Sequence, residues 1–174
     1  MVDYLSKSDT LSSLRNNALI QLGFFGAFRR SELVAIQWEH VTFSKQGIEV
    51  LIPLSKTDKK NEGQTIAIPY GSDKICAVRA LKAWQDSSKI NNGYIFRRID
   101  KASRMSDKAI GSSHVNYIIK TLVTACQFDN PDQYSAHSLR GGFATEASRK
   151  GASFKSIMQQ GRWKSGVCAP LRGM

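Results

Sequence analysis

Three short segments of the sequence carry cationic side chains in patterns that suit phosphate binding. In the first, Arg29 and Arg30 stand at the predicted start of a helix, and Glu32 lies close enough in sequence to orient one of them. A guanidinium can donate two parallel hydrogen bonds to a phosphate. The same residues also suit a solvated arginine–glutamate pair, so this segment decides nothing by itself.

The second segment is His137-Ser138-Leu139-Arg140-Gly141-Gly142-Phe143. Its histidine and arginine are three residues apart, so they share one face if the segment is helical. One anion can then contact both side chains and the positive end of the helix dipole. Each glycine is unfavourable by about 1 kcal/mol in a helix interior, which indicates a close backbone approach. A capping histidine beside an exposed arginine is the alternative.

The third segment, SKTDKKNEGQ, contains Lys56 and joins two apolar, β-branched runs. It has ten residues, whereas hairpin loops usually have about two to five. A lysine on such an arm can protonate a leaving group as a general acid. A solvated surface lysine is the alternative.

The sequence lacks the motifs of several conventional enzyme classes. It contains no P-loop, dinucleotide-binding, zinc-protease or nucleophile-elbow motif. His40, His114 and His137 are dispersed, and the carboxylates are scattered, so no cluster is predicted to hold zinc or paired magnesium ions. We therefore expect no metal and no small-molecule cofactor, and a phosphate held by fixed cationic side chains.

Composition indicates one soluble, basic domain. The 174 residues include 25 Lys+Arg and 14 Asp+Glu, for a net charge of +11. Such a surplus attracts nucleic acid, although a merely basic protein has the same balance. No apolar run approaches the roughly 20 residues of a membrane span, and no signal peptide is visible. Cys76, Cys126 and Cys168 form no C-x-x-C pair, so we expect a cytoplasmic protein with no membrane partner.

Apolar spacing predicts a mainly α-helical domain with one small antiparallel β-sheet (α+β). A hairpin is expected to pair residues 47–54 with 65–69, and Asp9 or Thr10 is expected to cap the first helix. The segment from Tyr94 to Phe96 is predicted to be buried. Helices are expected over Leu11–Phe25, from Ser31 towards Trp38, from Ser72 through Ile75, Val78, Leu81 and Trp84, from Ser112 or Ser113 to Cys126, from Ser138 to about Lys150, and from Ser153 through Gln160.

Taken together, the cationic segments resemble the catalytic domain of the tyrosine recombinases, the phage integrase family. FGAFRRSELVAI resembles the first arginine box, with Arg29 at the catalytic arginine and Glu32 at its supporting acid. SKTDKK resembles the β-hairpin lysine motif, with Lys56 at the lysine. AHSLRGGFATEA resembles the His-x-x-Arg box, and QQGRWKS resembles the segment with a second His or Trp, here Trp163. The resemblance covers about residues 11–165.

The resemblance implies metal-free cleavage and rejoining of DNA in site-specific recombination or integration. In this family a tyrosine attacks a phosphodiester to form a 3′-phosphotyrosine, and a hydroxyl later reverses the step. By resemblance, Arg29 and Arg140 bind the phosphate and Lys56 protonates the leaving oxygen. His137 would assist proton transfer, and Trp163 would pack or hydrogen-bond through its indole N–H. The implied partners are double-stranded DNA and other protomers of the family.

The nucleophilic tyrosine is missing from its expected place. In the family it follows the Trp/His segment by about nine residues, which here corresponds to Arg172, and the last tyrosine of the sequence is Tyr134. We therefore expect a chain that cannot cleave DNA by itself. The expected divisions are an N-terminal stub over residues 1–10, an integrase-like catalytic domain over 11–165, and an atypical tail without the tyrosine helix over 166–174.

Three functions stay open at this point. The first is a recombinase-family domain that acts on DNA. The second is a non-catalytic DNA-binding or regulatory remnant of an integrase, which the missing tyrosine favours. The third is a type IB topoisomerase-like protein, which shares the phosphate pocket and the chemistry. The compact spacing of the motifs fits integrases better than topoisomerases.

Overall fold

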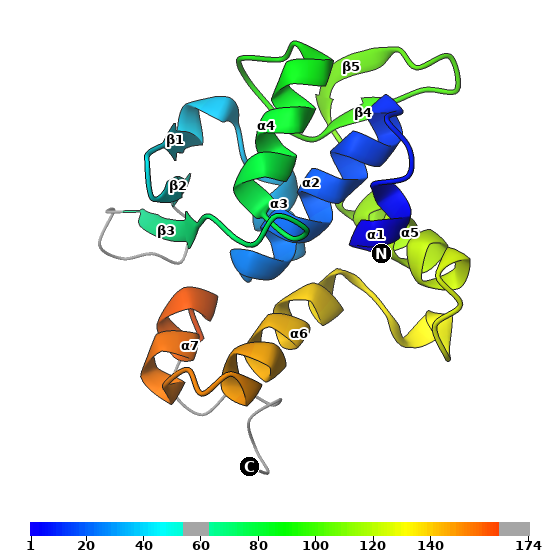
Figure 1. Ribbon diagram of the computed structural model, residues 1–174. Helices are drawn as coiled ribbons and strands as arrows, with labels where there is room; N and C mark the ends of the chain where they lie inside the picture. The colour runs from blue at the N-terminus through cyan, green and yellow to red at the C-terminus, as the bar shows by residue number, and fades with distance from the viewer. Residues whose placement is uncertain (54–62, 164–174) are drawn as a thin grey trace.

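Helix α2 (Leu11–Phe25) lies in the middle of the computed structural model, which describes residues 1–53 and 63–163 (Figure 1). The Thr10 hydroxyl caps the helix by accepting a hydrogen bond from the backbone N–H of Ser13. Its buried side packs against α4 (Ala77–Ser88). On α4, the fully buried Trp84 donates its indole N–H to the carbonyl of Ile95 at 2.9 Å. The prediction of the first helix is confirmed.

Helix α4 begins later than the sequence predicts. The expected start was Ser72, but residues before Ala77 form a loop, and Ile75 is 44% exposed instead of buried. The Arg79 guanidinium donates hydrogen bonds to the carbonyl oxygens of Gly71 and Ser72, and these bonds hold the loop in a non-helical conformation. The rest of the predicted stripe is buried.

A three-stranded antiparallel sheet contains the predicted hairpin. Strand β2 (Gly47–Ile52) pairs with β3 (Gln64–Pro69), and β1 (Val41–Phe43) adds a third strand in the order β1-β2-β3. Ile48 stands opposite Ile68, and their side chains are buried on the same face. The hairpin prediction is confirmed.

The prediction of a single sheet is wrong. Within the described ranges a second sheet pairs β4 (Arg97–Ile99) with β5 (Met105–Ala109) in the basic stretch. Asp100 closes this hairpin because its carboxylate accepts hydrogen bonds from the backbone N–H groups of Ala102 and Arg104. In the preceding segment, which was predicted to be buried, Ile95 and Phe96 are fully buried and Tyr94 is half-buried.

The remaining helices follow the second hairpin. They are α5 (Ser112–Ala125), α6 (Ala136–Arg149) and α7 (Phe154–Gly161); α6 and α7 lie side by side below the rest of the molecule in Figure 1. Helix α6 starts at Ala136 rather than Ser138 because Ser135 caps it. It ends as predicted, before Gly151 in the left-handed region at φ 78°. The expected close approach occurs at Gly142, where a Cβ would lie 3.3 Å from the Phe24 ring.

Short elements complete the fold. Helix α1 (Val2–Leu5) lies within the segment expected to be a stub, and Leu5 is buried in the core. Helix α3 (Arg30–Ala35) is shorter than predicted, since the chain then forms the 3₁₀ turn η1 (Trp38–His40). A second 3₁₀ turn, η2 (Pro131–Gln133), precedes α6. In the described parts of the chain no helix has the length and apolarity needed to cross a membrane. The expected class, mainly α with small antiparallel β-sheets, is confirmed.

Candidate phosphate-binding site

Residues from distant parts of the chain meet at one concavity of about 710 Å³. Arg29 enters it from the start of α3, His137 and Arg140 from the first turns of α6, and Trp163 from the segment after α7. The predicted convergence of Arg29, His137 and Arg140 is therefore observed. Arg30, Asn116, Ser135 and the N-terminal end of α6 also line the concavity.

Arg140 is the buried cation of this site, with 4% of its surface exposed. Its Nη1 donates a hydrogen bond to the carbonyl of Ala27, in the turn between α2 and α3. Its guanidinium lies over the Trp163 ring, 4.2 Å from the ring centroid. Cationic and aromatic groups attract one another at this distance. Trp163 thus packs on the predicted phosphate-binding arginine, while His137 stands exposed one turn earlier on α6.

The N-terminal end of α6 is fixed at the concavity by two side chains. Ser135 accepts a hydrogen bond from the backbone N–H of His137 at 3.2 Å. Asn116 of α5 accepts one from the backbone N–H of Ala136 at 2.9 Å. These bonds hold the first turn of α6, and with it His137, against α5.

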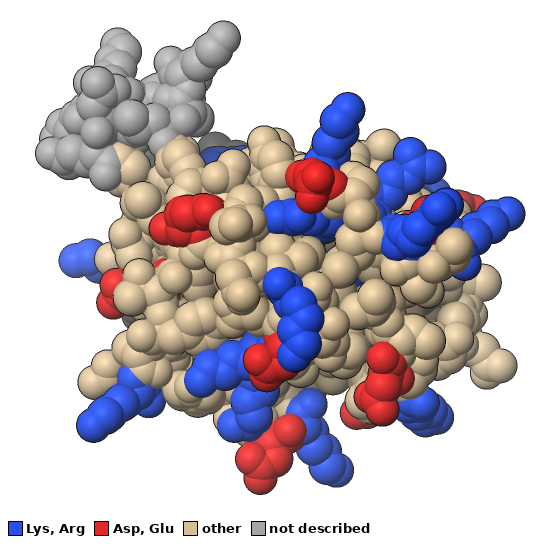
Figure 2. Space-filling model, turned by 90° about the horizontal axis from the view of Figure 1, so that it is seen from above, with Lys and Arg blue, Asp and Glu red and all other residues tan. Residues whose placement is uncertain are grey.

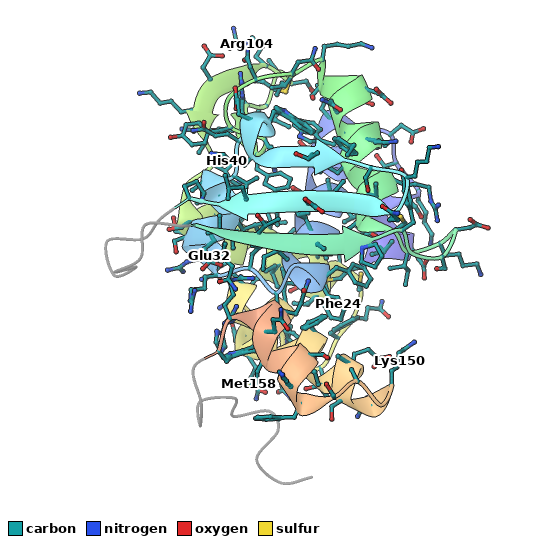
Figure 3. The ribbon with its side chains drawn as sticks, turned by 90° about the vertical axis from the view of Figure 1, so that its left-hand side faces the viewer. Phe24, Glu32, His40, Arg104, Lys150 and Met158 are labelled. Carbon is teal, nitrogen blue, oxygen red and sulfur yellow. The ribbon has the colours of Figure 1, made fainter. Side chains whose placement is uncertain are left out.

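Arg29 and Glu32 form the contact that their spacing suggests. The Glu32 carboxylate accepts hydrogen bonds from the Arg29 backbone N–H at 2.7 Å and from its Nη1 at 2.5 Å. The Arg29 side chain remains 54% exposed and so can reach a ligand, whereas that of Glu32 is 14% exposed. Figure 3 shows Glu32 between the three-stranded sheet and helices α6 and α7.

Arg162 is a member of this cluster that the sequence analysis missed. Its Nη2 contacts the second oxygen of Glu32 at 2.8 Å and the carbonyl of Ala27 at 3.0 Å. Its Nη1 donates to the carbonyl of Gly26 at 3.1 Å. Nη1 also donates to the nearby carbonyl of Gln160, but Gly26, Ala27 and Glu32 lie more than a hundred residues away in sequence, so no local spacing indicates them. The only sequence signal is its position next to Trp163 in the QQGRWKS segment.

The charge of Arg162 governs the ionisation of Glu32. Burial by itself raises the pKa of this carboxyl group. The nearby Arg162 charge and the hydrogen bonds from Arg29 and Arg162 outweigh that effect and hold the pKa of Glu32 below its ordinary value of 4.5. Burial lowers the pKa of Arg162, and the charge of Glu32 opposes that shift. Glu32 is therefore an anion at neutral pH.

Ala27 has an unusual backbone conformation at the centre of the cluster. Its φ is 44°, a left-handed value that residues other than glycine rarely adopt. Its carbonyl oxygen accepts hydrogen bonds from both Arg140 and Arg162. Strained backbone of this kind persists where surrounding contacts determine it. The two arginines supply those contacts.

Two sequence predictions cannot be placed in this geometry. Lys56, expected to be the general acid, and Arg172, at the expected tyrosine position, lie outside the described residues. Across residues 1–53 and 63–163 no group of three or more His, Cys, Asp or Glu side chains is arranged to hold a metal ion.

Solved structures of recombinases share this fold. The XerH site-specific recombinase, in a post-cleavage complex with palindromic difH substrate, matches with a TM-score of 0.72 and 16% identity over 94% of this chain and 44% of that chain. XerA recombinase matches with a TM-score of 0.66 and 20% identity over 86% of this chain and 48% of that chain. The fold is that of a tyrosine recombinase catalytic domain.

The sequence itself shows the family. Residues 1–168 match the profile of the phage integrase family, and the chain belongs to that family. It is 44% identical over 162 residues to an integrase/recombinase xerD homolog of Selenomonas ruminantium, covering 92% of this chain and 47% of that protein. It is 25% identical to recombinase cre of Escherichia phage P1, covering 91% of this chain and 49% of that protein. The chain thus spans about half the length of these curated relatives.

The Glu32 pair leads to a stability prediction. Glu32→Gln keeps the shape of the side chain but leaves the charge of Arg162 buried without its partner. Breaking one side of such a pair is expected to lower the free energy of unfolding by about 3 kcal/mol, measured by urea titration at pH 7. The matched control is Glu146→Gln, which removes an exposed pair with Lys150 at 3.7 Å and should change stability by less than about 0.5 kcal/mol. Equal losses in both variants would contradict the role given to Glu32.

The same variant has a defined pH signature. Because the folded-state pKa of Glu32 is lowered, its contribution is fully present above its ordinary pKa of 4.5 and is lost as the pH falls through the folded-state value. The stability difference between wild type and Glu32→Gln should therefore shrink below about pH 5. Taking the difference cancels the contributions of Glu39 and Asp100, whose pKa values are lowered by backbone hydrogen bonds from Gly93 and Arg104.

Proposed function

We propose that this chain binds double-stranded DNA as the catalytic-domain part of a site-specific recombinase. The observation that carries the proposal is the convergence of Arg29 and Arg140, 111 positions apart in sequence, on one concavity that His137 also lines. Fixed cations of this kind suit a phosphodiester, whose charge lies on its non-bridging oxygens. Membership of the phage integrase family supports the same assignment.

The charge of the chain supports DNA as the partner. The net charge is +11, and Figure 2 shows lysines and arginines spread over one face among fewer acidic side chains. Such a distribution favours contacts with many backbone phosphates over one localised ligand. The XerH structure contains its difH substrate, and we extend this mode of binding to the present chain. Other protomers of the family are the further partners, and the cytoplasm is the proposed place of action.

Each side chain of the site has a proposed task. Arg29 and Arg140 stabilise charge on the phosphate oxygens, and Trp163 fixes the guanidinium of Arg140 by packing on it. His137, exposed at the positive end of α6, assists proton transfer at the attacking or leaving oxygen. Lys56 protonates the leaving oxygen by resemblance to the family. No metal ion is required by this assignment, because the arginines carry the positive charge.

The ability to cleave is a separate question. Arg172 stands where the family pattern places its nucleophilic tyrosine, and a guanidinium carries no nucleophilic oxygen. We propose that the chain binds DNA without forming a covalent link to it. This observation favours a second candidate function, a non-catalytic DNA-binding or regulatory member of the integrase family. The family match favours either of these over a type IB topoisomerase.

DNA binding is tested by titrating a duplex at increasing salt concentrations. The logarithm of the association constant should fall linearly with the logarithm of salt, by roughly 0.9 per phosphate contacted. Arg140→Ala should weaken binding to all sequences alike, because phosphate contacts carry no base preference. The matched control is Arg79→Ala, which likewise removes an arginine that donates to backbone carbonyls but lies outside the concavity. Its effect should be smaller. An affinity that does not change with salt concentration, or no binding at low salt, would exclude the proposal.

The cleavage proposal is tested with nicked suicide substrates, which trap covalent intermediates. The chain should form no denaturation-resistant adduct with them, because in-line attack needs a positioned oxygen nucleophile. A recombinase of the family that has its tyrosine serves as the positive control. Arg172→Tyr alone should not restore the adduct, since Pro170 and Gly166 are unfavourable in the helix that would position the phenol. An adduct formed by the unaltered chain would refute the proposal and point to another nucleophile, such as Tyr134.

A further inference from the structure

Arg162 is buried behind the phosphate concavity and is not among the described residues that line it. Its side chain is 6% exposed, so it is not placed to touch a bound duplex. Its two terminal nitrogens are used within the protein, by the carbonyls of Gly26, Ala27 and Gln160 and by the Glu32 carboxylate. The guanidinium also lies 5.2 Å from the centroid of the Phe28 ring. Apart from Gln160, which lies on α7, these partners belong to the turn that precedes α3 or to its first turn.

Arg162 and Arg29 share the carboxylate of Glu32. One oxygen accepts from Arg29 Nη1 at 2.5 Å, and the other accepts from Arg162 Nη2 at 2.8 Å. The backbone carbonyl of Arg162 lies 3.4 Å from Arg29 Nη2 and accepts a further hydrogen bond from it. The exposed guanidinium of Arg29 is thus held at two points: at the Glu32 carboxylate, whose other oxygen Arg162 contacts, and at the backbone carbonyl of Arg162.

The end of α7 has attachments that do not depend on the Arg162 side chain. Gln160 donates hydrogen bonds to the carbonyls of Phe25 and Ala67 at 3.0 and 3.2 Å. Gly161 lies directly under the Trp163 ring, where an added Cβ would be 1.7 Å from a ring carbon. Changing the side chain at 162 removes its hydrogen bond to the Gln160 carbonyl at 2.9 Å but leaves the bonds that the Gln160 side chain donates to Phe25 and Ala67. A local effect on Glu32 and Arg29 can then be separated from loss of the helix.

We propose that Arg162 is a positioning residue that holds Arg29 in the orientation in which it binds a phosphate. Arg162 acts through Glu32 and through the backbone of residues 26–29, without contact to the ligand. This inference rests on the proposed function, because the phosphate is the ligand that Arg29 is held to meet. The residue that follows α7 thereby helps to fix the orientation of an arginine at the start of α3.

A double-mutant cycle with duplex DNA tests the inference. Arg162→Met keeps the length of the apolar stem and removes the guanidinium. It should weaken binding about tenfold in the wild-type background, the size of one charge-assisted hydrogen bond. In the Arg29→Ala background the same change should alter affinity by less than about twofold, because the residue it positions is gone. The matched control is Arg97→Met, which removes an ion pair with Asp107 and two carbonyl contacts away from the site and should leave affinity unchanged.

Several outcomes would overturn the proposal. A tenfold loss in both backgrounds would mean that Arg162 acts independently of Arg29, and no loss in the wild-type background would mean that it does not position Arg29 at all. If Arg162→Met fails to fold by circular dichroism, Arg162→Lys replaces it. That variant keeps the charge, but its ammonium cannot span Glu32 and the two carbonyls. The same cycle and the same outcomes then apply.

A measurement without DNA keeps this inference separate from the proposed function. A guanidinium held at two points rotates slowly about its Nε–Cζ bond, so Arg29 should give separate ¹⁵Nη resonances in the wild-type protein. These resonances should merge in Arg162→Lys and persist in Arg97→Met. Persistence in Arg162→Lys would overturn the inference, even if duplex DNA binds as expected. If wild type binds no duplex DNA, the proposed function fails, and these resonances alone decide whether Arg162 positions Arg29.

Discussion

The carboxylate of Glu32, held between two guanidinium groups, is the interaction on which the site depends. A mostly buried carboxyl group tends to take up a proton, and it stays ionised here because Arg162 and Arg29 both contact it. Arg162 is itself buried, so neither member of the pair is stable without the other. Together with the hydrogen bonds that Gln160 donates to Phe25 and Ala67, this pair places the C-terminal end of α7 against the start of α3. Arg29 is the exposed end of this chain of contacts.

The carbonyl oxygen of Ala27 holds Arg140 in place, as the Glu32 carboxylate holds Arg29. It accepts hydrogen bonds from α6 through Arg140 and from the end of α7 through Arg162. The turn between α2 and α3 therefore fixes the positions of two arginines: Arg140, which lines the concavity, and Arg162, which is buried behind it. Its left-handed backbone, at φ 44°, is maintained by these contacts. The geometry of the site thus follows from tertiary hydrogen bonds more than from helix propensity.

How much could be predicted from sequence depends on how local each feature is. The long helices and the hairpin follow from apolar spacing, and His137 and Arg140 form a short pattern on one helix face. The role of Arg162 was not predicted because its carboxylate partner, Glu32, is 130 positions away in sequence. The second sheet was not predicted because residues Arg97–Lys108 alternate too weakly between apolar and polar types to indicate strands. The late start of α4 depends on the Arg79 side chain, which folds back onto the preceding loop.

The central claim is that this concavity receives a DNA phosphate between Arg29 and Arg140. The most direct test is a crystal structure of the chain bound to a short duplex at low salt. One backbone phosphate should lie within hydrogen-bonding distance of both guanidinium groups, about 3 Å from each, with the His137 ring beside it. A duplex bound to another face, with no phosphate between the two arginines, would contradict the claim.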